Sequence, residues 1–254
     1  MNRVPLKESG VKNIKDFDWL FYFEYNNSHL LKLDFTENQE LTSDEIHLIA
    51  PSIRAFQIGE GSDGRHLNRV VENFADKADY PQYKKIMDWF IIEENRHSQT
   101  LKKYMEIYNI SSAKALWLDN VFRLLRRLMG LECEVIVLVT AEMIALSYYS
   151  ALSNATNSIL LKTICRQMLN DELKHVVLQS DTLNRISKGR GAIFNNAVRK
   201  IRKILMRLTC FVVFFKYKNL FAAGGYSYKK FKSDSMEYLR ESICIERNLD
   251  YEKA

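Results

Sequence analysis

The chain has 254 residues, 47% of them hydrophobic, which is enough apolar material for one sizeable core in a single domain. It contains only three prolines and nine glycines, a composition that favours long helices and argues against a β architecture with many turns. Four scattered cysteines without a C-x-x-C pair exclude a zinc ribbon and a disulfide scaffold. With a net charge of +6 and no apolar leader at its start, the sequence predicts an all-α cytoplasmic protein with reduced thiols.

Residues 1–42 are rich in aromatic side chains but lack helical periodicity, so we expect them to form an arm packed across the rest of the domain. Thr42-Ser43-Asp44-Glu45 has the composition of a helix start, and apolar residues then recur at three-or-four spacing. The first core helix is therefore predicted from the mid-forties to about Ala75, with Pro51 as a kink or as the true start.

Three further helices complete a predicted four-helix core over residues 43–186. The second helix follows a turn at Ala78-Asp79-Tyr80-Pro81, and the third begins at Asp119 or after Gly130. A polar turn over residues 153–158 separates the third helix from the fourth. Short connections of this kind predict antiparallel neighbours in a bundle.

Two Glu-x-x-His tetrads occur in a chain with only five histidines. They are Glu94-Asn95-Arg96-His97 on the second predicted helix and Glu172-Leu173-Lys174-His175 on the fourth. Residues three apart share one face of a helix, so each tetrad can give a metal ion one oxygen and one nitrogen ligand. A pair of such tetrads on apolar helix faces is typical of a carboxylate-bridged two-metal site.

The turn between the third and fourth helices selects a further acid for this site. Glu142 lies about 14 residues before residue 156 and Glu172 about 16 after it, so at about 1.5 Å per residue they stand at the same level. Glu132 and Glu134 lie too far from the turn to reach that level. The third helix is therefore predicted to contribute Glu142.

Distances in residues from the turn between the first two helices favour Glu60 as the fourth acid. Glu72 is not selected, because it lies too close to that turn. Four carboxylates facing an apolar interior require compensating charge, which two ferrous ions supply. Oxygen and imidazole ligands suit iron or manganese, so an Fe/Mn or Mn/Mn pair stays open as an alternative. The predicted ligands, which are also the catalytic residues acting through the metals, are Glu60, Glu94, His97, Glu142, Glu172 and His175.

An acid precedes each tetrad, Glu93 before the first and Asp171 before the second. A histidine that binds a metal commonly donates its other ring N–H to a carboxylate. The approximate two-fold symmetry of such a bundle pairs each acid with the histidine of the opposite tetrad. We therefore expect Asp171 to serve His97 and Glu93 to serve His175.

The run Glu93-Glu94-Asn95-Arg96-His97 resembles the E-E-N-R-H element of soluble acyl-carrier-protein desaturases, and residues 171–175 resemble their D-E-x-x-H element. The resemblance covers roughly residues 44–186 and implies a ferritin-like bundle with a di-iron carboxylate centre. In that family the second and fifth residues of each element bind iron, which here are Glu94, His97, Glu172 and His175. The resemblance implies an oxidoreductase that uses dioxygen and an external electron donor to desaturate or hydroxylate an apolar or acyl substrate.

Two other functions fit the same ligands. One is iron handling, meaning ferrous oxidation or storage by a ferritin-like protein without an organic substrate. The other is a helical bundle that binds metal without catalysis.

Residues 187–254 form a basic, helical C-terminal segment, with no acid between Asp181 and Asp234. An acidic partner such as an acyl carrier protein, or an anionic membrane surface, would suit such a segment. A solvated surface without a partner and a homodimer also remain open, and nucleic acid ranks last because no motif for reading it occurs. The residues predicted to dock a partner are Arg199, Lys200, Arg202, Lys203 and Arg207.

Overall fold

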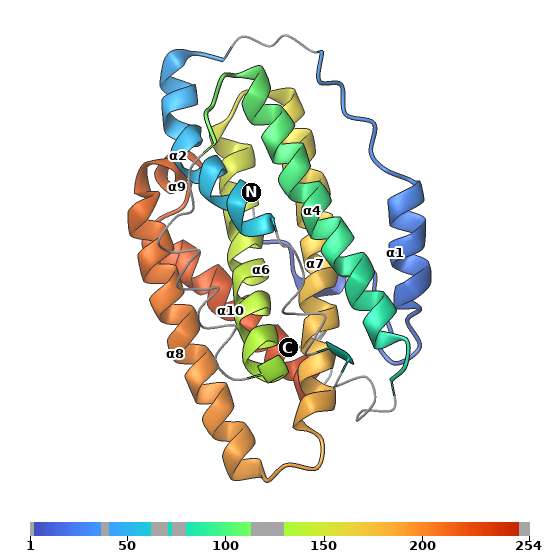
Figure 1. The fold of residues 1–254 in the computed structure, drawn as a ribbon. Helices are drawn as coiled ribbons and strands as arrows, with labels where there is room; N and C mark the ends of the chain where they lie inside the picture. Colours follow the sequence, from blue (N-terminus) through green and yellow to red (C-terminus); the bar gives the residue numbers. More distant parts are fainter. Residues whose placement is uncertain (1–2, 37–40, 62–70, 73–79, 113–129, 249–254) are drawn as a thin grey trace. The chain divides into compact units, whose positions relative to one another are not determined.

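The computed structural model describes residues 3–36, 41–61, 71–72, 80–112 and 130–248, and every regular element in these ranges is helical. The prediction of an all-α fold is thus confirmed for this part of the chain, whereas the ferritin-like arrangement stays a prediction. The elements are η1 (Leu6–Ser9), α1 (Trp19–Ser28), α2 (Ser43–Glu60), α4 (Tyr83–Ile107), α6 (Gly130–Ala155), α7 (Ile159–Ser187), α8 (Ala192–Lys216), α9 (Lys218–Ala223) and α10 (Tyr228–Glu246) (Figure 1).

The start of α2 agrees with the prediction, but its end does not. Thr42 caps the helix, its hydroxyl accepting a hydrogen bond from Glu45 N at 3.2 Å, and Pro51 lies inside the helix. The helix ends at Glu60 because Gly61 adopts an extended conformation (φ −77°, ψ 113°). The predicted continuation to Ala75 is therefore wrong at Gly61, and most of residues 62–79 lie outside the described ranges.

The later helices match the sequence pattern more closely. Helix α6 begins at Gly130, the later of the two predicted starts, and the earlier one at Asp119 lies outside the described residues. Residues 156–158 separate α6 from α7. The predicted arm contains α1, which Asp18 caps by accepting from Phe21 N at 3.0 Å. Its aromatic side chains point both inward and outward, so no apolar stripe marks this helix in the sequence.

The chain divides into two compact units, and each is described by itself. Unit 1 consists of Met1–Phe17, Val135–Ala155 and Met168–Ala254, and unit 2 of Asp18–Glu134 and Thr156–Gln167. The prediction of a single domain stays a prediction.

In unit 2, α4 packs against both α1 and α2 (Figure 1). Glu45 of α2 joins this helix to the turn before α7. Its carboxylate accepts hydrogen bonds from Thr156 Oγ1 at 2.6 Å, Asn157 N at 2.7 Å and Asn157 Nδ2 at 3.2 Å. Burial raises the pKa of Glu45, but these hydrogen bonds outweigh burial and hold the pKa below its ordinary value of 4.5.

In unit 1, α8 packs along α10 through a buried network of ionic groups. Arg202 is 1% exposed and donates to Glu246, and its other terminal nitrogen donates to Ser242 Oγ at 2.9 Å. Arg3 forms a two-point contact with Glu241 at 2.8 and 3.0 Å, which fixes the N-terminal segment to α10.

Gly224, after α9, approaches α6 within unit 1 more closely than any other residue type would allow. A Cβ atom at this position would lie 2.3 Å from the carbonyl oxygen of Ala151. Asn154 Nδ2 donates to the Gly224 carbonyl at 3.3 Å from the same helix. This contact sets the path of the chain between α8 and α10.

One described helix, α6, is long and apolar enough to cross a membrane, and 89% of its most apolar stretch is buried inside the protein. The four cysteines all lie in the described ranges and form no disulfide, and burial raises the pKa of the Cys210 thiol to about 11. Such a thiol stays protonated at neutral pH and serves packing.

We predict that Gly224→Ala lowers the free energy of unfolding by about 1 to 3 kcal/mol, because backbone must move to admit the Cβ atom. Gly59→Ala is the matched control, since nothing lies within 4 Å of its Cβ position in α2. There, alanine should leave stability unchanged or raise it by up to about 1 kcal/mol. Urea denaturation of both variants measures the difference, and equal stabilities would contradict the close contact.

We also predict that Glu45→Gln lowers stability at neutral pH by about 1 to 3 kcal/mol, because an ionised acceptor of three hydrogen bonds is lost. Since the folded pKa is depressed, the stabilisation is present above pH 4.5 and is lost as the pH falls through the folded value. The variant should therefore lose less stability between neutral and acid pH than the parent chain. Glu24→Gln, which removes an exposed partner of Lys85, should change stability by less than about 1 kcal/mol.

Candidate metal centre

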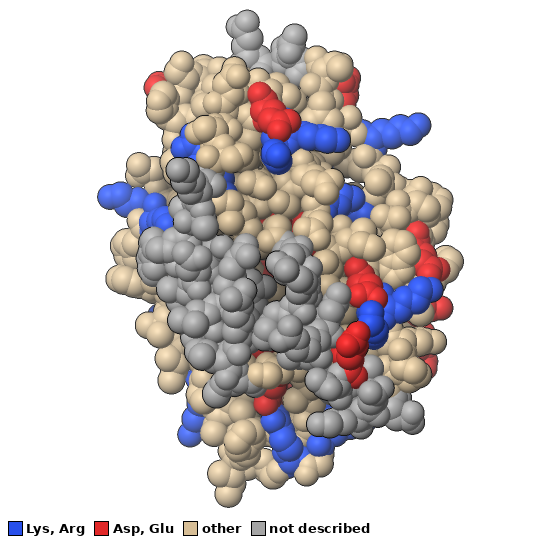
Figure 2. Space-filling view, in the orientation of Figure 1, with Lys and Arg blue, Asp and Glu red and all other residues tan. Residues whose placement is uncertain are grey.

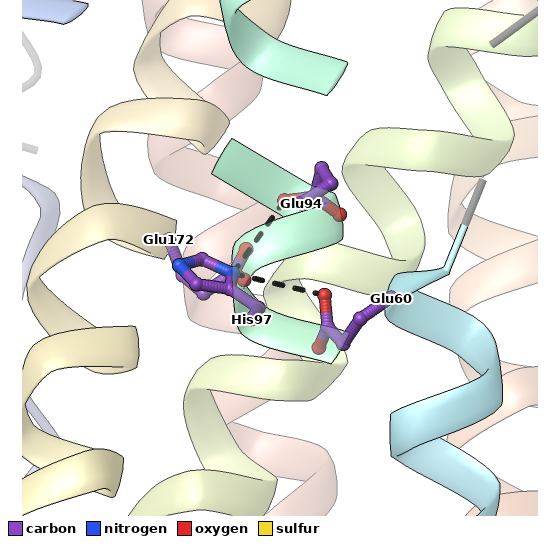
Figure 3. A group of neighbouring side chains, drawn as sticks. All are labelled: Glu60, Glu94, His97 and Glu172. Carbon is purple, nitrogen blue, oxygen red and sulfur yellow. Dashed lines mark ion pairs between the residues drawn. The ribbon is translucent and has the colours of Figure 1, made fainter. Parts of the chain in front are cut away.

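Unit 2 brings one predicted lone acid and one predicted tetrad together. His97 Nδ1 lies 3.9 Å from Glu60 Oε2 and 3.8 Å from Glu94 Oε1. Glu60 and His97 are 7% and 2% exposed, and Glu94 is partly exposed. The side chains come from the last residue of α2 and the middle of α4, and both acids point toward the imidazole (Figure 3).

A hydrogen-bonded contact between α2 and α4 fixes Glu60 opposite the tetrad. Ser98, the residue after His97, accepts from Gln57 Nε2 at 2.9 Å and donates to the Gln57 carbonyl at 2.8 Å. A Cβ atom on Gly61 would lie 3.1 Å from Ser98 Oγ, so a glycine lets the chain leave α2 close to α4. The glycine-rich end of α2 therefore places the first acid.

Glu60, Glu94 and His97 form a group of three candidate ligands within unit 2, with one ligand atom from each within 4.8 Å of the others (Figure 3). An ion bound at about 2.0–2.2 Å from each donor holds neighbouring ligands about 3–4 Å apart. The Glu60 to His97 and Glu94 to His97 distances are close to that spacing. The donors, oxygen with imidazole nitrogen and no thiolate, could hold a divalent metal ion, and its identity as iron or manganese stays a prediction.

Unit 1 contains the second set of three predicted ligands. Glu142, Glu172 and His175 are 5%, 1% and 0% exposed, and His175 Nδ1 lies 3.5 Å from Glu172 Oε2. The break between α6 and α7 centres on residue 157, so Glu142 and Glu172 each lie about 15 residues from it, as the prediction of equal depth in antiparallel helices requires. Metal binding by Glu142, Glu172 and His175 stays a prediction.

Glu93 has partners on α1 that the sequence did not reveal. It is 2% exposed, and it accepts hydrogen bonds from Asn26 Nδ2, from Arg96 and, at 3.4 Å, from Tyr22 Oη. Tyr22 and Asn26 lie four residues apart on one face of α1, a spacing visible in the sequence once a helix is expected there. The arm thus contributes to the surroundings of the first tetrad.

The predicted roles of Glu93 toward His175 and of Asp171 toward His97 stay predictions. Asp171 is 0% exposed, which is rare for an acid and requires a compensating partner. Its burial agrees with a role inside the protein and argues against an ordinary solvated carboxylate.

Gln179 is a buried polar residue that the sequence analysis did not single out. It lies one turn after His175 on α7 and is 0% exposed. Neither its Oε1 nor its Nε2 has a hydrogen-bond partner among the described residues. Each buried polar atom left without a partner costs about 1 to 3 kcal/mol, so this amide is destabilising unless it serves a bound group.

The five predicted docking residues divide into two groups. Lys200, Lys203 and Arg207 are exposed on α8. Arg202 is instead buried against Glu246, and Arg199 Nε donates to the same carboxylate at 2.9 Å. The prediction that Arg199 and Arg202 dock a partner is therefore wrong. The five residues lie on two sides of α8, and only the side with Lys200, Lys203 and Arg207 faces solvent.

Comparisons with protein-family models, with curated proteins and with solved structures found no match. The assignment of the centre consequently depends on the geometry and chemistry of its own residues.

We predict that Gln179→Leu leaves the free energy of unfolding unchanged or raises it by up to about 2 kcal/mol, because no hydrogen bond is lost. Ser180→Ala is the control from the same helix, since Ser180 Oγ lies 2.7 Å from Ser242 Oγ and donates to the Val176 carbonyl. That variant should lose about 1 kcal/mol. A destabilisation of Gln179→Leu as large as that of the control would show that the amide is satisfied inside the protein.

Proposed function

We propose that this protein is a di-iron oxidoreductase that uses dioxygen to desaturate or hydroxylate an apolar organic substrate. The observation that carries the proposal is the position of Glu60 and Glu94 around the buried His97, with one ligand atom from each of the three within 4.8 Å of the others. The resemblance of both tetrads to those of acyl-carrier-protein desaturases supports the same function and a ferritin-like fold. A carrier-bound acyl chain is the substrate class that the resemblance favours.

The ligands would divide evenly between the two metals. Glu60, Glu94 and His97 offer one set of two acids and one imidazole, and α6 and α7 offer an equivalent set. Four ionised carboxylates balance the charge of two ferrous ions, so the buried site would be neutral overall. When bound, a reduced iron pair supplies electrons to dioxygen, which allows oxidation of unactivated C–H bonds.

The chain's own residues would orient the ligands and keep water out. Each histidine must present a neutral imidazole nitrogen to its metal, and a carboxylate that accepts the opposite N–H fixes the ring. Phe90 and Leu101, one turn before Glu94 and one turn after His97, are 2% and 0% exposed. These buried apolar neighbours would exclude bulk solvent from the metals and provide a surface for an apolar substrate.

We predict that His97→Ala and His175→Ala each lose bound iron, because each removes the single imidazole of one ligand set. The chain is reconstituted anaerobically with ferrous iron, and iron per chain is then measured by elemental analysis. His29→Ala and His47→Ala are the controls, since both histidines are exposed, and these variants should retain the iron of the parent chain. Two irons per chain in both His97→Ala and His175→Ala would contradict the proposal.

Adding a reductant and dioxygen to the iron-loaded chain distinguishes an oxygenase from an iron-handling protein. An oxygenase should couple oxygen consumption to an oxidised organic product when given acyl substrates. Oxidation of excess ferrous iron with storage of the ferric product, and no organic product, would instead indicate iron handling.

A further inference from the structure

Helix α8 has an exposed apolar face that the metal site does not explain. Six residues form what we call the α8 stripe, each between 49% and 89% exposed: Ile193, Ile201, Ile204, Leu208, Phe211 and Phe215. At about 100° per residue they fall within about 80° of one another around the helix. A stripe from Ile193 to Phe215 is about 33 Å long, so it presents apolar surface along nearly the whole helix.

The opposite face of α8 is already occupied. Met206, Thr209 and Val213 are buried, and the helix packs along α10. The α8 stripe is therefore additional to the apolar face that holds the helix in the fold. Contiguous exposed apolar surface of this extent marks an interaction site in a soluble domain.

Three basic residues, which we call the basic flank, border the α8 stripe on one side. Lys200, Lys203 and Arg207 are all exposed and cover about 60° of the helix next to the stripe. No acid occurs between Asp181 and Asp234, so nothing in this helix offsets their charge. Along the lower left margin in Figure 2, over α8, the surface is tan and blue without red.

The charge of α8 decides between its candidate partners. A second copy of this helix would offer the basic flank no carboxylate in either parallel or antiparallel pairing, because α8 contains no acid. An anionic lipid surface provides both a diffuse negative charge for the basic flank and an apolar layer for Ile, Leu and Phe side chains. Large apolar residues on one face with lysine and arginine beside them are typical of helices that lie in a membrane interface.

We propose that the exposed face of α8 binds the surface of anionic membranes, with the α8 stripe inserted among the lipids and the basic flank against their headgroups. The helix would lie parallel to the membrane plane and would not cross it. Arg199 and Arg202 take no part, because their guanidinium groups hold Glu246 of α10. This binding is independent of the metals and applies to the chain with or without iron.

Flotation of the full chain with lipid vesicles tests the proposal. The chain should float with phosphatidylcholine vesicles that contain phosphatidylglycerol, and much less with phosphatidylcholine alone. Lys200→Gln with Lys203→Gln should weaken binding about tenfold or more, and raised salt should weaken the parent chain in the same direction. Lys12→Gln with Lys15→Gln, two exposed lysines outside α8, is the matched control and should bind like the parent.

The apolar contribution needs its own pair of variants. Ile204→Gln with Leu208→Gln should abolish flotation, whereas Phe21→Gln with Ile159→Gln, which removes equally exposed apolar side chains elsewhere, should not. Helix content by circular dichroism should match the parent in all variants. Absence of flotation with anionic vesicles would overturn the proposal. So would flotation that survives loss of Ile204 and Leu208, or a dimer in sedimentation that these substitutions dissociate while vesicles bind nothing.

Discussion

The burial of several carboxylates is the constraint on which the rest of this structure depends. Glu60, Glu142 and Glu172 are each less than 10% exposed, and Asp171 is fully buried. The nearest carboxylate oxygens of Glu60 and Glu94 lie within 4.8 Å of each other, so two ionised groups there repel by about 3 kcal/mol or more at an effective dielectric constant of about 20. A fold that gathers such groups needs a compensating positive charge, and divalent ions held by oxygen and imidazole provide it most directly.

The surrounding structure is organised to keep these acids in place. The Gln57 and Ser98 hydrogen bonds join α2 to α4 next to His97, and α1 supplies Tyr22 and Asn26 to Glu93. Precise placement of this kind matters for a metal site, because ligand geometry is set by groups that do not touch the ion. Segments distant from the tetrads in sequence thus support the site.

The sequence predicted those parts of the structure that follow from helical periodicity. It located α4, α7 and α8, and it singled out the buried His97, Glu172 and His175 and the partly exposed Glu94, because these residues recur in a pattern on apolar faces. It missed α1, because the aromatic residues of this helix form no apolar stripe. It extended α2 too far, because the extended conformation of Gly61 leaves no sign in the hydrophobic periodicity. Partners such as Glu246 for Arg202 could not be foreseen, because they depend on which helices meet and not on local spacing.

The proposed metal centre depends on charged residues in the interior, and the proposed membrane binding depends on apolar residues at the surface. Both are departures from the usual distribution of residues in a soluble domain, and such departures mark function more reliably than the packed core does. An apolar substrate dissolved in lipid would be available to a protein that lies on a membrane, so the two proposals are compatible although neither requires the other.

X-ray absorption spectroscopy of the chain reconstituted with ferrous iron tests the central claim most directly, because it reports both the ligands and any neighbouring metal. We expect two irons per chain, with oxygen and nitrogen ligands, no sulfur ligand, and a second iron about 3.5–4 Å from the first. A single iron without a metal neighbour, or coordination by cysteine sulfur, would contradict it.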